Sequence, residues 1–513
     1  MRILVAGIVA IVMMFPLHVA AGFTFDQVVQ KAKILADKPY EAPQPVPKFM
    51  REISYEAYQG IRFNPDRSLW KESQSNFQVM FIAPGLYYTH PVTVNVIEAE
   101  GPRPLLFKKT DFVFSDPEVE KRVPADVGYA GFKLTFPLKS KNEQNQFMVF
   151  AGASYFRGVG KENTFGISGR GLAVDTGLPS GEVFPAFTEF WLVRPSPDAK
   201  EMVVYGLLDS DSLTGAYQFT IVPGSQTKIK VRTELFPRKP IQLLGMAPLT
   251  SMFFYGENTP RPRGEWRREV HDSDGLQIHD GLTSEWLWRP LLNPANLEMD
   301  FFSTDNVKGF GLLQREGKFS GYEDLGAHYE QRPSAWVEPQ GDWGQGKVVL
   351  VQLPTADETN DNIVAFWTPQ APVTRDTPVA LAYDVGFGKA NISQNPMGAV
   401  VNTFIGDGNL IGGGKVPQAY RIIIDFAGGP LSKLPANAPI NGQVTALDNS
   451  EIFEHFVEYH EEIQGWRLSI LAKPADKKPL HVRAFLKTDS TTLTETWTYR
   501  LPTNNHILAQ EKE

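Results

Sequence analysis

The sequence predicts an all-β protein built from two β-sandwiches, a large one followed by a smaller one. Three observations support this prediction: apolar residues alternate with polar ones in short runs, Gly or Pro bounds each run, and Gly and Pro are abundant. The 43 Gly and 39 Pro residues together exceed the roughly 12% of a chain that is usual. Side chains at a period of two place one strand face on a core and the other in water, so stacked antiparallel sheets are the simplest arrangement. The alternation is clearest at residues 77–81, 132–136 and 229–235.

The first 21 residues have the pattern of a cleaved signal peptide. Arg2 precedes an apolar run from Ile3 to Leu17, and small residues follow up to Ala21, which is the order that a signal peptidase recognises. The run is shorter than the ~20 residues that span a bilayer, and Pro16 interrupts it. No later segment is apolar enough to span, so we predict a mature chain without a membrane span, exported to the periplasm of a Gram-negative bacterium.

Residues 22–370 are predicted to form the large sandwich. Thr24 and Gln27 have the spacing of a helix capping box, so a short helix opens this domain and runs to about Ala36. Period-two alternation then dominates. At residues 368–378 three prolines stand in a stretch without apolar pattern, and this composition marks a domain boundary.

Residues 371–415 are predicted to be a linker and loop, because Asn391 to Lys415 is rich in Gly and Asn and has little apolar pattern. Residues 416–513 alternate again, and turn residues separate the runs at the spacing of a sandwich of about a hundred residues. An immunoglobulin-like β-sandwich is therefore expected there. The strongest runs are 420–426, 466–470 and 493–501.

Charge and composition exclude several classes of function. The chain has 50 Lys and Arg against 58 Asp and Glu, a net charge of −8, which argues against nucleic acid as a partner because a phosphate backbone is held by clustered cations. Without Cys there is no disulfide, thiolate metal site or cysteine nucleophile. The nine His residues form no His-Glu-x-x-His pair. We therefore predict no metal and no cofactor.

A cluster of tryptophans and acids points instead to carbohydrate. Sugars stack their apolar faces on aromatic rings, while their hydroxyls bond to Asp, Glu, Asn and Arg. Two acidic clusters, 271–274 and 357–362, fall in the Trp-rich stretch, although core tryptophans and solvated acidic turns explain the same composition. Six of the ten Trp lie within this stretch: Trp266, Trp286, Trp288, Trp336, Trp343 and Trp367.

Several segments together resemble a known bacterial family. These are residues 152–157, 169–176, 247–253, 271–276, 285–290, 309–315, 332–336 and 357–364. They closely resemble the periplasmic glucan biosynthesis proteins of types G and D, and the likeness runs from about Phe25 to Pro369. It is looser over the last 140 residues or so. Because the leader lacks a twin-Arg pair, the chain is similar to type G more than to type D.

The resemblance implies a mutarotase-like large sandwich and a role in making osmoregulated periplasmic glucans, whose backbone is β-1,2-linked glucose. Some members resemble inverting endo-β-1,2-glucanases, in which one Asp is the acid and another is the base that acts through a relay of waters. By motif, Asp361 corresponds to the acid and Asp272 to the base. Tyr329 is a candidate for holding the relay. Residues 386–416 depart from the family pattern, and a lid over the cleft could lie there.

Alternatives remain at these positions. Asp357 and Glu358 are rivals for the acid, and Asp274 is a rival for the base. The residues expected to bind substrate are Trp288, Arg289, Arg332, Trp336, Trp343, Asp274, Asp357 and Glu358. A non-catalytic scaffold that presents nascent glucan to branching enzymes or to a membrane glucan synthase is the main alternative function, and a branching transglycosylase is a third.

Overall fold

Strands dominate the computed structural model, which describes residues 22–447, 450–475, 478–489 and 491–502. The predicted signal peptide, residues 1–21, lies outside the described residues. The all-β prediction is confirmed: the chain forms two large sheets and a smaller four-stranded one. Among the described helices, none has the length and apolar character needed to cross a membrane.

The large sandwich consists of a ten-stranded and a fifteen-stranded sheet. In spatial order the first contains β2 (Gln78–Ile82), β6 (Gly131–Phe136), β7 (Asn145–Ala151), β8 (Tyr155–Gly158), β9 (Ser168–Arg170), β15 (Leu244–Ser251), β24 (Ile363–Pro369), β23 (Gln345–Gln352) and β20 (Glu298–Asp305), with β10 (Leu172–Val174) paired to β15.

The second sheet runs through both parts of the molecule. Its order is β28 (Asn441–Ala446), β31 (Leu480–Thr488), β33 (Thr496–Leu501), β19 (Trp286–Pro290), β18 (Gly275–His279), β21 (Gly309–Leu313), β22 (Ser334–Gln340), β25 (Val379–Gly388), β14 (Thr227–Pro237), β13 (Leu213–Val222), β12 (Met202–Asp209), β11 (Ala186–Val193), β3 (Thr93–Glu98) and β4 (Gly101–Pro104), with β32 (Thr491–Thr492) beside β31.

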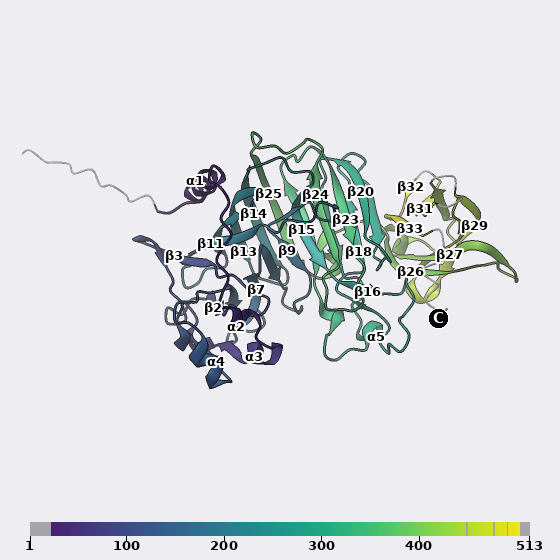
Figure 1. Ribbon diagram of the computed structural model, residues 1–513. Coiled ribbons are helices and arrows are strands. Elements are labelled where there is room, and N and C mark those ends of the chain that lie inside the picture. The colour runs from purple at the N-terminus through teal and green to yellow at the C-terminus, as the bar shows by residue number, and fades with distance from the viewer. Residues whose placement is uncertain (1–21, 448–449, 476–477, 490, 503–513) are drawn as a thin grey trace, which may run out of the picture.

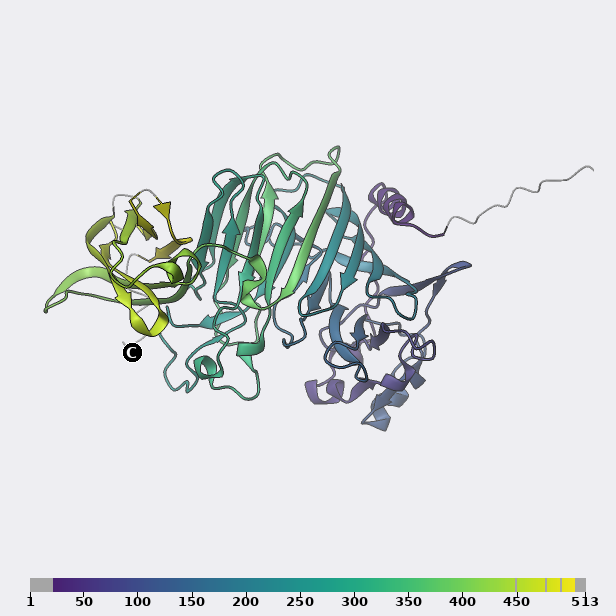
Figure 2. The same ribbon diagram turned by 180° about the vertical axis from the view of Figure 1, so that it is seen from behind.

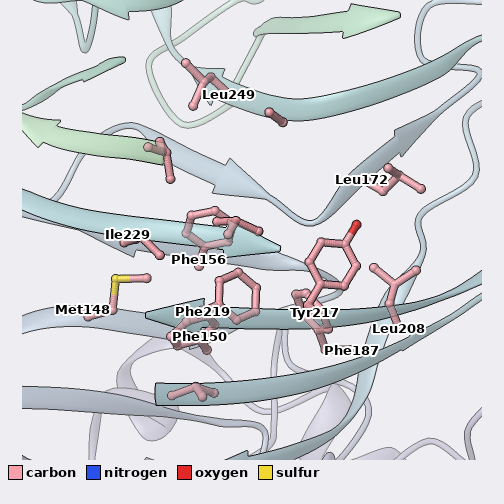
Figure 3. Packing of buried hydrophobic residues seen from close by; sticks show 14 of the residues in the cluster. Met148, Phe150, Phe156, Leu172, Phe187, Leu208, Tyr217, Phe219, Ile229 and Leu249 are labelled. Carbon is pink, nitrogen blue, oxygen red and sulfur yellow. The ribbon is translucent and has the colours of Figure 1, made fainter. Parts of the chain in front are cut away.

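The core of the large sandwich lies between these sheets and is rich in phenylalanine. Figure 3 shows Phe150, Phe156, Phe187 and Phe219 packed together with Tyr217. Phe150 and Phe219 meet edge to face with their ring centroids 5.2 Å apart, one of the arrangements that aromatic rings prefer. These inward residues come from alternate positions of their strands, as the period of two predicts.

The predicted opening helix is present as α1 (Phe25–Ala36). The backbone N–H of Thr24 donates to the Gln27 side chain at 2.8 Å, and Val28 and Ala32 are fully buried. Thr214 of β13 donates its hydroxyl to the Ala32 carbonyl at 2.7 Å. The helix therefore covers the outer face of the second sheet.

Short elements gather at one end of the large sandwich, opposite the small one (Figures 1 and 2). They are the helices α2 (Lys48–Arg51), α3 (Tyr55–Gln59) and α4 (Pro117–Arg122), the 3₁₀ turns η1 (Pro65–Arg67) and η2 (Lys109–Asp111), and the paired strands β1 (Ile61–Phe63) and β5 (Phe112–Phe114). Elsewhere lie β16 (Phe253–Tyr255) paired with β17 (Val270–His271), α5 (Phe319–Tyr322), η3 (Tyr329–Gln331) and η4 (Ala390–Ser393).

The structure differs from the predicted linker and loop at 371–415. Strand β25 lies between β14 and β22, so the large sandwich continues past residue 370. Strand β26 (Ala399–Asn409) pairs along its length with β27 (Lys415–Ala427). The Gly-rich stretch is the tip of this hairpin, where Gly412, Gly413 and Gly414 all have positive φ, a conformation that glycine adopts at little cost.

The small sandwich packs the sheet β26–β27–β30–β29 against β28, β31 and β33, which belong to the long sheet. Here β29 is Glu451–His460 and β30 is Gly465–Lys473, with the turns η5 (Gly429–Lys433) and η6 (Glu461–Ile463). The predicted stripes at 420–426, 466–470 and 493–501 supply its core. Strand β33 runs parallel to β19, which joins the two parts into one sheet.

A buried carboxylate fixes this junction. Glu495, with a side chain that is 0% exposed, pairs with Arg315 at 2.6 Å. It also accepts hydrogen bonds from Gln277 at 2.8 Å, Asn395 at 2.9 Å and the backbone N–H of Val400 at 2.8 Å. Both sandwiches therefore converge on one charge that is fully satisfied.

We expect Glu495→Ala to destabilise the protein strongly. The change leaves the Arg315 guanidinium without its partner, and removing one member of a buried ion pair costs about 3–5 kcal/mol. Thermal unfolding followed by circular dichroism should show a clearly lower melting temperature, while Glu451→Ala at an exposed strand position should not. Equal melting temperatures for the two variants would contradict the role of this junction.

Candidate functional site

A large groove lies at the end of the sandwich that carries the short helices. Its volume is about 1130 Å³, and its lining comes from α3, β1, β2, β7, β8 and the loop at 83–88. The aromatic residues in this lining are Tyr55, Tyr58, Phe63, Phe81, Tyr87, Tyr88, Phe112, Tyr155, Phe156 and Phe165. One carboxylate, Asp361, also lines the groove.

The tyrosines of the groove differ in how firmly they are held. Tyr58 donates its hydroxyl to the Ala83 carbonyl at 2.8 Å, and its ring lies against Gly85, where a Cβ would come within 3.2 Å of the ring. Tyr55 and Tyr87 are 59% and 79% exposed. Such rings present apolar faces on which a sugar can stack.

The tryptophans that the sequence suggested for substrate are buried instead. Trp288 and Trp336 are 3% exposed and Trp343 is 7% exposed. Trp336 stacks on Trp286 with centroids 5.8 Å apart, and Trp343 packs against Trp367 at 5.1 Å. Their rings belong to the cores, so the expectation that they stack on sugar is corrected: the exposed aromatic faces of the groove are tyrosines.

Asp361 sits between a surface turn and the buried strand β24. Its Oδ2 atom lies 3.4 Å from the guanidinium of Arg157, and Arg157 in turn donates to the Ser168 hydroxyl at 2.7 Å. Two strands of the first sheet, β8 and β9, therefore hold the cation that faces Asp361.

Asp272 follows strand β17 and is only 7% exposed. Its backbone N–H donates to the Met252 carbonyl at 2.8 Å, and its Oδ1 atom is 3.4 Å from Nε of Arg332. Burial raises the pKa of the Asp272 carboxyl, the positive charge of Arg332 lowers it, and the negative charge of Asp361 raises it again. The charge of Asp361 therefore acts on the buried Asp272 carboxyl.

Tyr329 and Arg332 belong to the same cluster. Burial raises the pKa of Tyr329, and the charges of Glu358 and Asp272 raise it further. The Arg332 guanidinium lies 5.5 Å from the centre of the Tyr329 ring. Space for Arg332 depends on Gly166, because a Cβ there would come within 2.8 Å of the arginine side chain. The structure therefore brings together Asp361, Asp272, Tyr329 and Arg332.

The rival acids are engaged in other contacts. Asp357 accepts from the backbone N–H of Thr359 at 2.8 Å and from its hydroxyl at 2.5 Å, and these hydrogen bonds hold the pKa of Asp357 below its usual range. Glu358 pairs with Arg267 at 2.6 Å. Asp357 is a turn cap with low proton affinity, which makes it a poor acid.

Two further predicted residues lie away from the groove. Arg289, 2% exposed, pairs with Asp300 at 2.9 Å and lies over the ring of Tyr499 at 4.8 Å. Asp274 accepts a hydrogen bond from the Glu316 backbone at 3.0 Å and lines a different cavity at the junction of the sandwiches. Neither residue is placed to touch a ligand in the groove.

Sequence reasoning missed a residue that aligns the two aspartates. Asn362 is 2% exposed; its amide accepts from the Phe253 backbone N–H at 2.9 Å and donates to the Phe253 and Leu353 carbonyls, both at 3.0 Å. Phe253 is the cross-strand partner of His271. Asn362 thus links the chain beside Asp361 to the strand that ends beside Asp272. Its only signal in the sequence is its position between an acidic turn and an apolar strand.

Comparison with known proteins identifies close relatives over nearly the whole chain. The family model described as "Periplasmic glucan biosynthesis protein, MdoG" matches residues 23–501. The chain is 44% identical over 492 residues to a glucans biosynthesis protein G from Dickeya dadantii, covering 94% of each chain. It is 43% identical over 488 residues to a protein of the same name from Ralstonia nicotianae, covering 94% of this chain and 97% of the relative.

We expect Asn362→Ala to lower the free energy of unfolding. The change leaves buried backbone groups of Phe253 and Leu353 without their hydrogen-bond partners. Each buried polar group left in this way costs about 1–3 kcal/mol. Thermal unfolding of the full chain measures the loss, with Asn360→Ala in the exposed turn as the control. A melting temperature equal to that of the control would show that the amide does not hold this strand.

Proposed function

Because the chain belongs to the periplasmic glucan biosynthesis protein family, we propose that it binds linear β-1,2-glucan in the tyrosine-lined groove and hydrolyses it within the chain, in the periplasm. The observation that supports this most directly is the position of Asp361. It lines the aromatic groove, and its charge acts on the pKa of a second, buried aspartate. Paired carboxyls beside an aromatic groove are the groups that glycoside hydrolysis requires.

Binding follows from the lining of the groove. The exposed rings of Tyr55 and Tyr87 stack on the apolar faces of glucose units, and Arg157 and Gln146 offer donors to their hydroxyls. A volume of about 1130 Å³ exceeds the upper range of about 1,000 Å³ that is usual for small-molecule pockets. An oligosaccharide segment, not a single sugar, therefore suits the groove.

The proposed chemistry is inverting hydrolysis. Asp361 gives its proton to the glycosidic oxygen as the bond from that oxygen to the anomeric carbon breaks. A water attacks the anomeric carbon from the opposite face and passes its proton, through further water held by Tyr329, to the Asp272 carboxylate. Arg157, 3.4 Å from Asp361, stabilises the carboxylate that remains after donation. One water is consumed and a new reducing end is formed.

A non-catalytic scaffold is the second candidate, and one observation favours it. Asp272 is 7% exposed and lies against Arg332, so the proposed base meets substrate water only through a relay. In that case the groove would hold nascent glucan for branching enzymes or for a membrane glucan synthase. The two functions differ in whether reducing ends appear.

Asp361→Asn should abolish the release of new reducing ends from β-1,2-glucan and leave binding within about threefold of the wild type. Loss of one general acid typically costs about 10²–10⁴ in rate. Asp357→Asn is the matched control, because an amide oxygen can still cap Thr359. Full activity in Asp361→Asn would reject the acid assignment. A wild-type protein that binds glucan and releases no reducing ends would support the scaffold.

Tyr87→Ala should weaken glucan binding without lowering thermal stability. The ring is 79% exposed, so its removal takes away stacking and little packing, and an aromatic contact of this kind is worth about 0.5–1.5 kcal/mol. Isothermal titration with a β-1,2-glucan oligosaccharide measures the change. Tyr459→Ala, at a 39% exposed tyrosine of the small sandwich, should bind like the wild type; equal affinities for both variants would place the glucan elsewhere.

A further inference from the structure

A second cavity lies at the junction of the two sandwiches, away from the groove. Its free volume is about 30 Å³, enough for an ion or one to two waters. Glu257, Glu269, His271, Asp274 and Glu316 contribute to its lining, together with residues of strand β26. The proposed glucan chemistry uses none of these side chains.

Three of these groups converge on one point. Nε2 of His271 lies 2.8 Å from Oε2 of Glu269 and 3.5 Å from Oδ1 of Asp274. One ligand atom from each of the three residues falls within 4.8 Å of the others. Zinc binds nitrogen and oxygen ligands at about 2.0–2.2 Å, so two ligand atoms on one ion lie roughly 3.3 Å apart. The observed distances from Nε2 of His271, 2.8 Å to Glu269 and 3.5 Å to Asp274, lie on either side of this value.

The hydrogen bonds of Gln314 determine which ring nitrogen of neutral His271 carries the proton and which carries the lone pair. The Gln314 amide NH₂ donates to the carbonyls of His271 at 2.9 Å and Tyr329 at 3.1 Å. Its oxygen is therefore the atom that lies 2.9 Å from Nδ1 of His271, and Nδ1 carries the proton. In the neutral ring Nε2 then carries a lone pair. This lone pair is directed at two carboxylates, which are hydrogen-bond acceptors as well.

Nε2 is fully buried, and among the described residues the atoms that face it are carboxylate oxygens of Glu269 and Asp274. The His271 side chain is 0% exposed, and a buried polar atom without a partner costs free energy. A proton shared with Glu269 or a metal ion satisfies it. Glu257 and Glu316 add two further carboxyl groups to the lining of the cavity.

We propose that Glu269, His271 and Asp274 bind one divalent transition-metal ion of the Zn²⁺ class. Imidazole nitrogen with two carboxylates is a ligand set that suits zinc better than calcium, which prefers oxygen alone. The hydrogen bond from Nδ1–H to Gln314 is the outer contact that usually orients a metal-binding histidine. The remaining coordination position opens into the cavity, where water or Glu257 completes the site.

The site would join the two sandwiches. Glu257 accepts a hydrogen bond from the backbone N–H of Thr403 in β26, while His271 ends strand β17 of the large sandwich. A bound ion therefore stabilises this junction by mass action, as any ligand that binds only the folded state does. The inference does not depend on glucan hydrolysis, and binding and stability, not activity, test it.

The test is titration of the chelator-treated, full-length protein with Zn²⁺. We expect one ion per chain by calorimetry, a higher melting temperature with Zn²⁺, and visible ligand-field absorption with Co²⁺ as a substitute ion. Glu269→Gln keeps the side-chain shape and removes one anionic ligand, so its Zn²⁺ affinity should fall at least about tenfold. Asp407→Asn, on the exposed hairpin of the small sandwich, should bind like the wild type.

Several outcomes would overturn the proposal. Absence of Zn²⁺ binding by the folded wild type would mean that a proton alone satisfies His271. A Zn²⁺ affinity of Glu269→Gln equal to that of the wild type would place the ion elsewhere in the protein. Tighter binding of Ca²⁺ than of Zn²⁺ would reject the assigned class. Glucan hydrolysis can fail its own test without affecting any of these measurements.

Discussion

The amide of Asn362 is the constraint on which the geometry of the groove end depends. A single side chain satisfies both backbone groups of Phe253 and the carbonyl of Leu353. Because Phe253 pairs with His271 across the β16–β17 ladder, two chain segments about ninety residues apart are fixed in register. Asp361 and Asp272 each stand one residue from this connection. The surface turn at 357–360 can therefore vary in conformation without separating them.

Much of the fold could be predicted because the alternation of apolar and polar residues along a strand shows which side chains are buried. The stripes at 420–426 and 466–470 became neighbouring, paired strands in one sheet of the small sandwich, and Thr24 and Gln27 opened the expected helix. Strand β26 escaped prediction because one of its faces is solvated and its Gly and Asn residues carry no apolar period. Strand β25 escaped because the prolines before it resemble a boundary, although its residues pair on both sides within the long sheet.

Part of the candidate site could be anticipated from the sequence, and the burial of each side chain decides which part. Family motifs led to Asp361, Asp272, Tyr329 and Arg332, which the fold brings together. Composition suggested aromatic stacking, but a sequence does not say which rings face solvent: the tryptophans pack inside, whereas Tyr87 protrudes. The contact of Glu269 with His271 and Asp274 could not be predicted either, because it depends on how the chain enters and leaves strand β17.

The parallel pairing of β33 with β19 has a consequence for how the two sandwiches depend on each other. Leu287 pairs with Thr496 and Trp288 with Trp497, so β33 occupies the edge of β19 at these two positions. Without the small sandwich, that strand would become an open sheet edge, with free N–H and C=O groups beside an uncovered apolar surface. Such edges recruit strands from other chains and promote aggregation. The small sandwich thus protects its neighbour from self-association, and an isolated large sandwich is a poor candidate for separate expression.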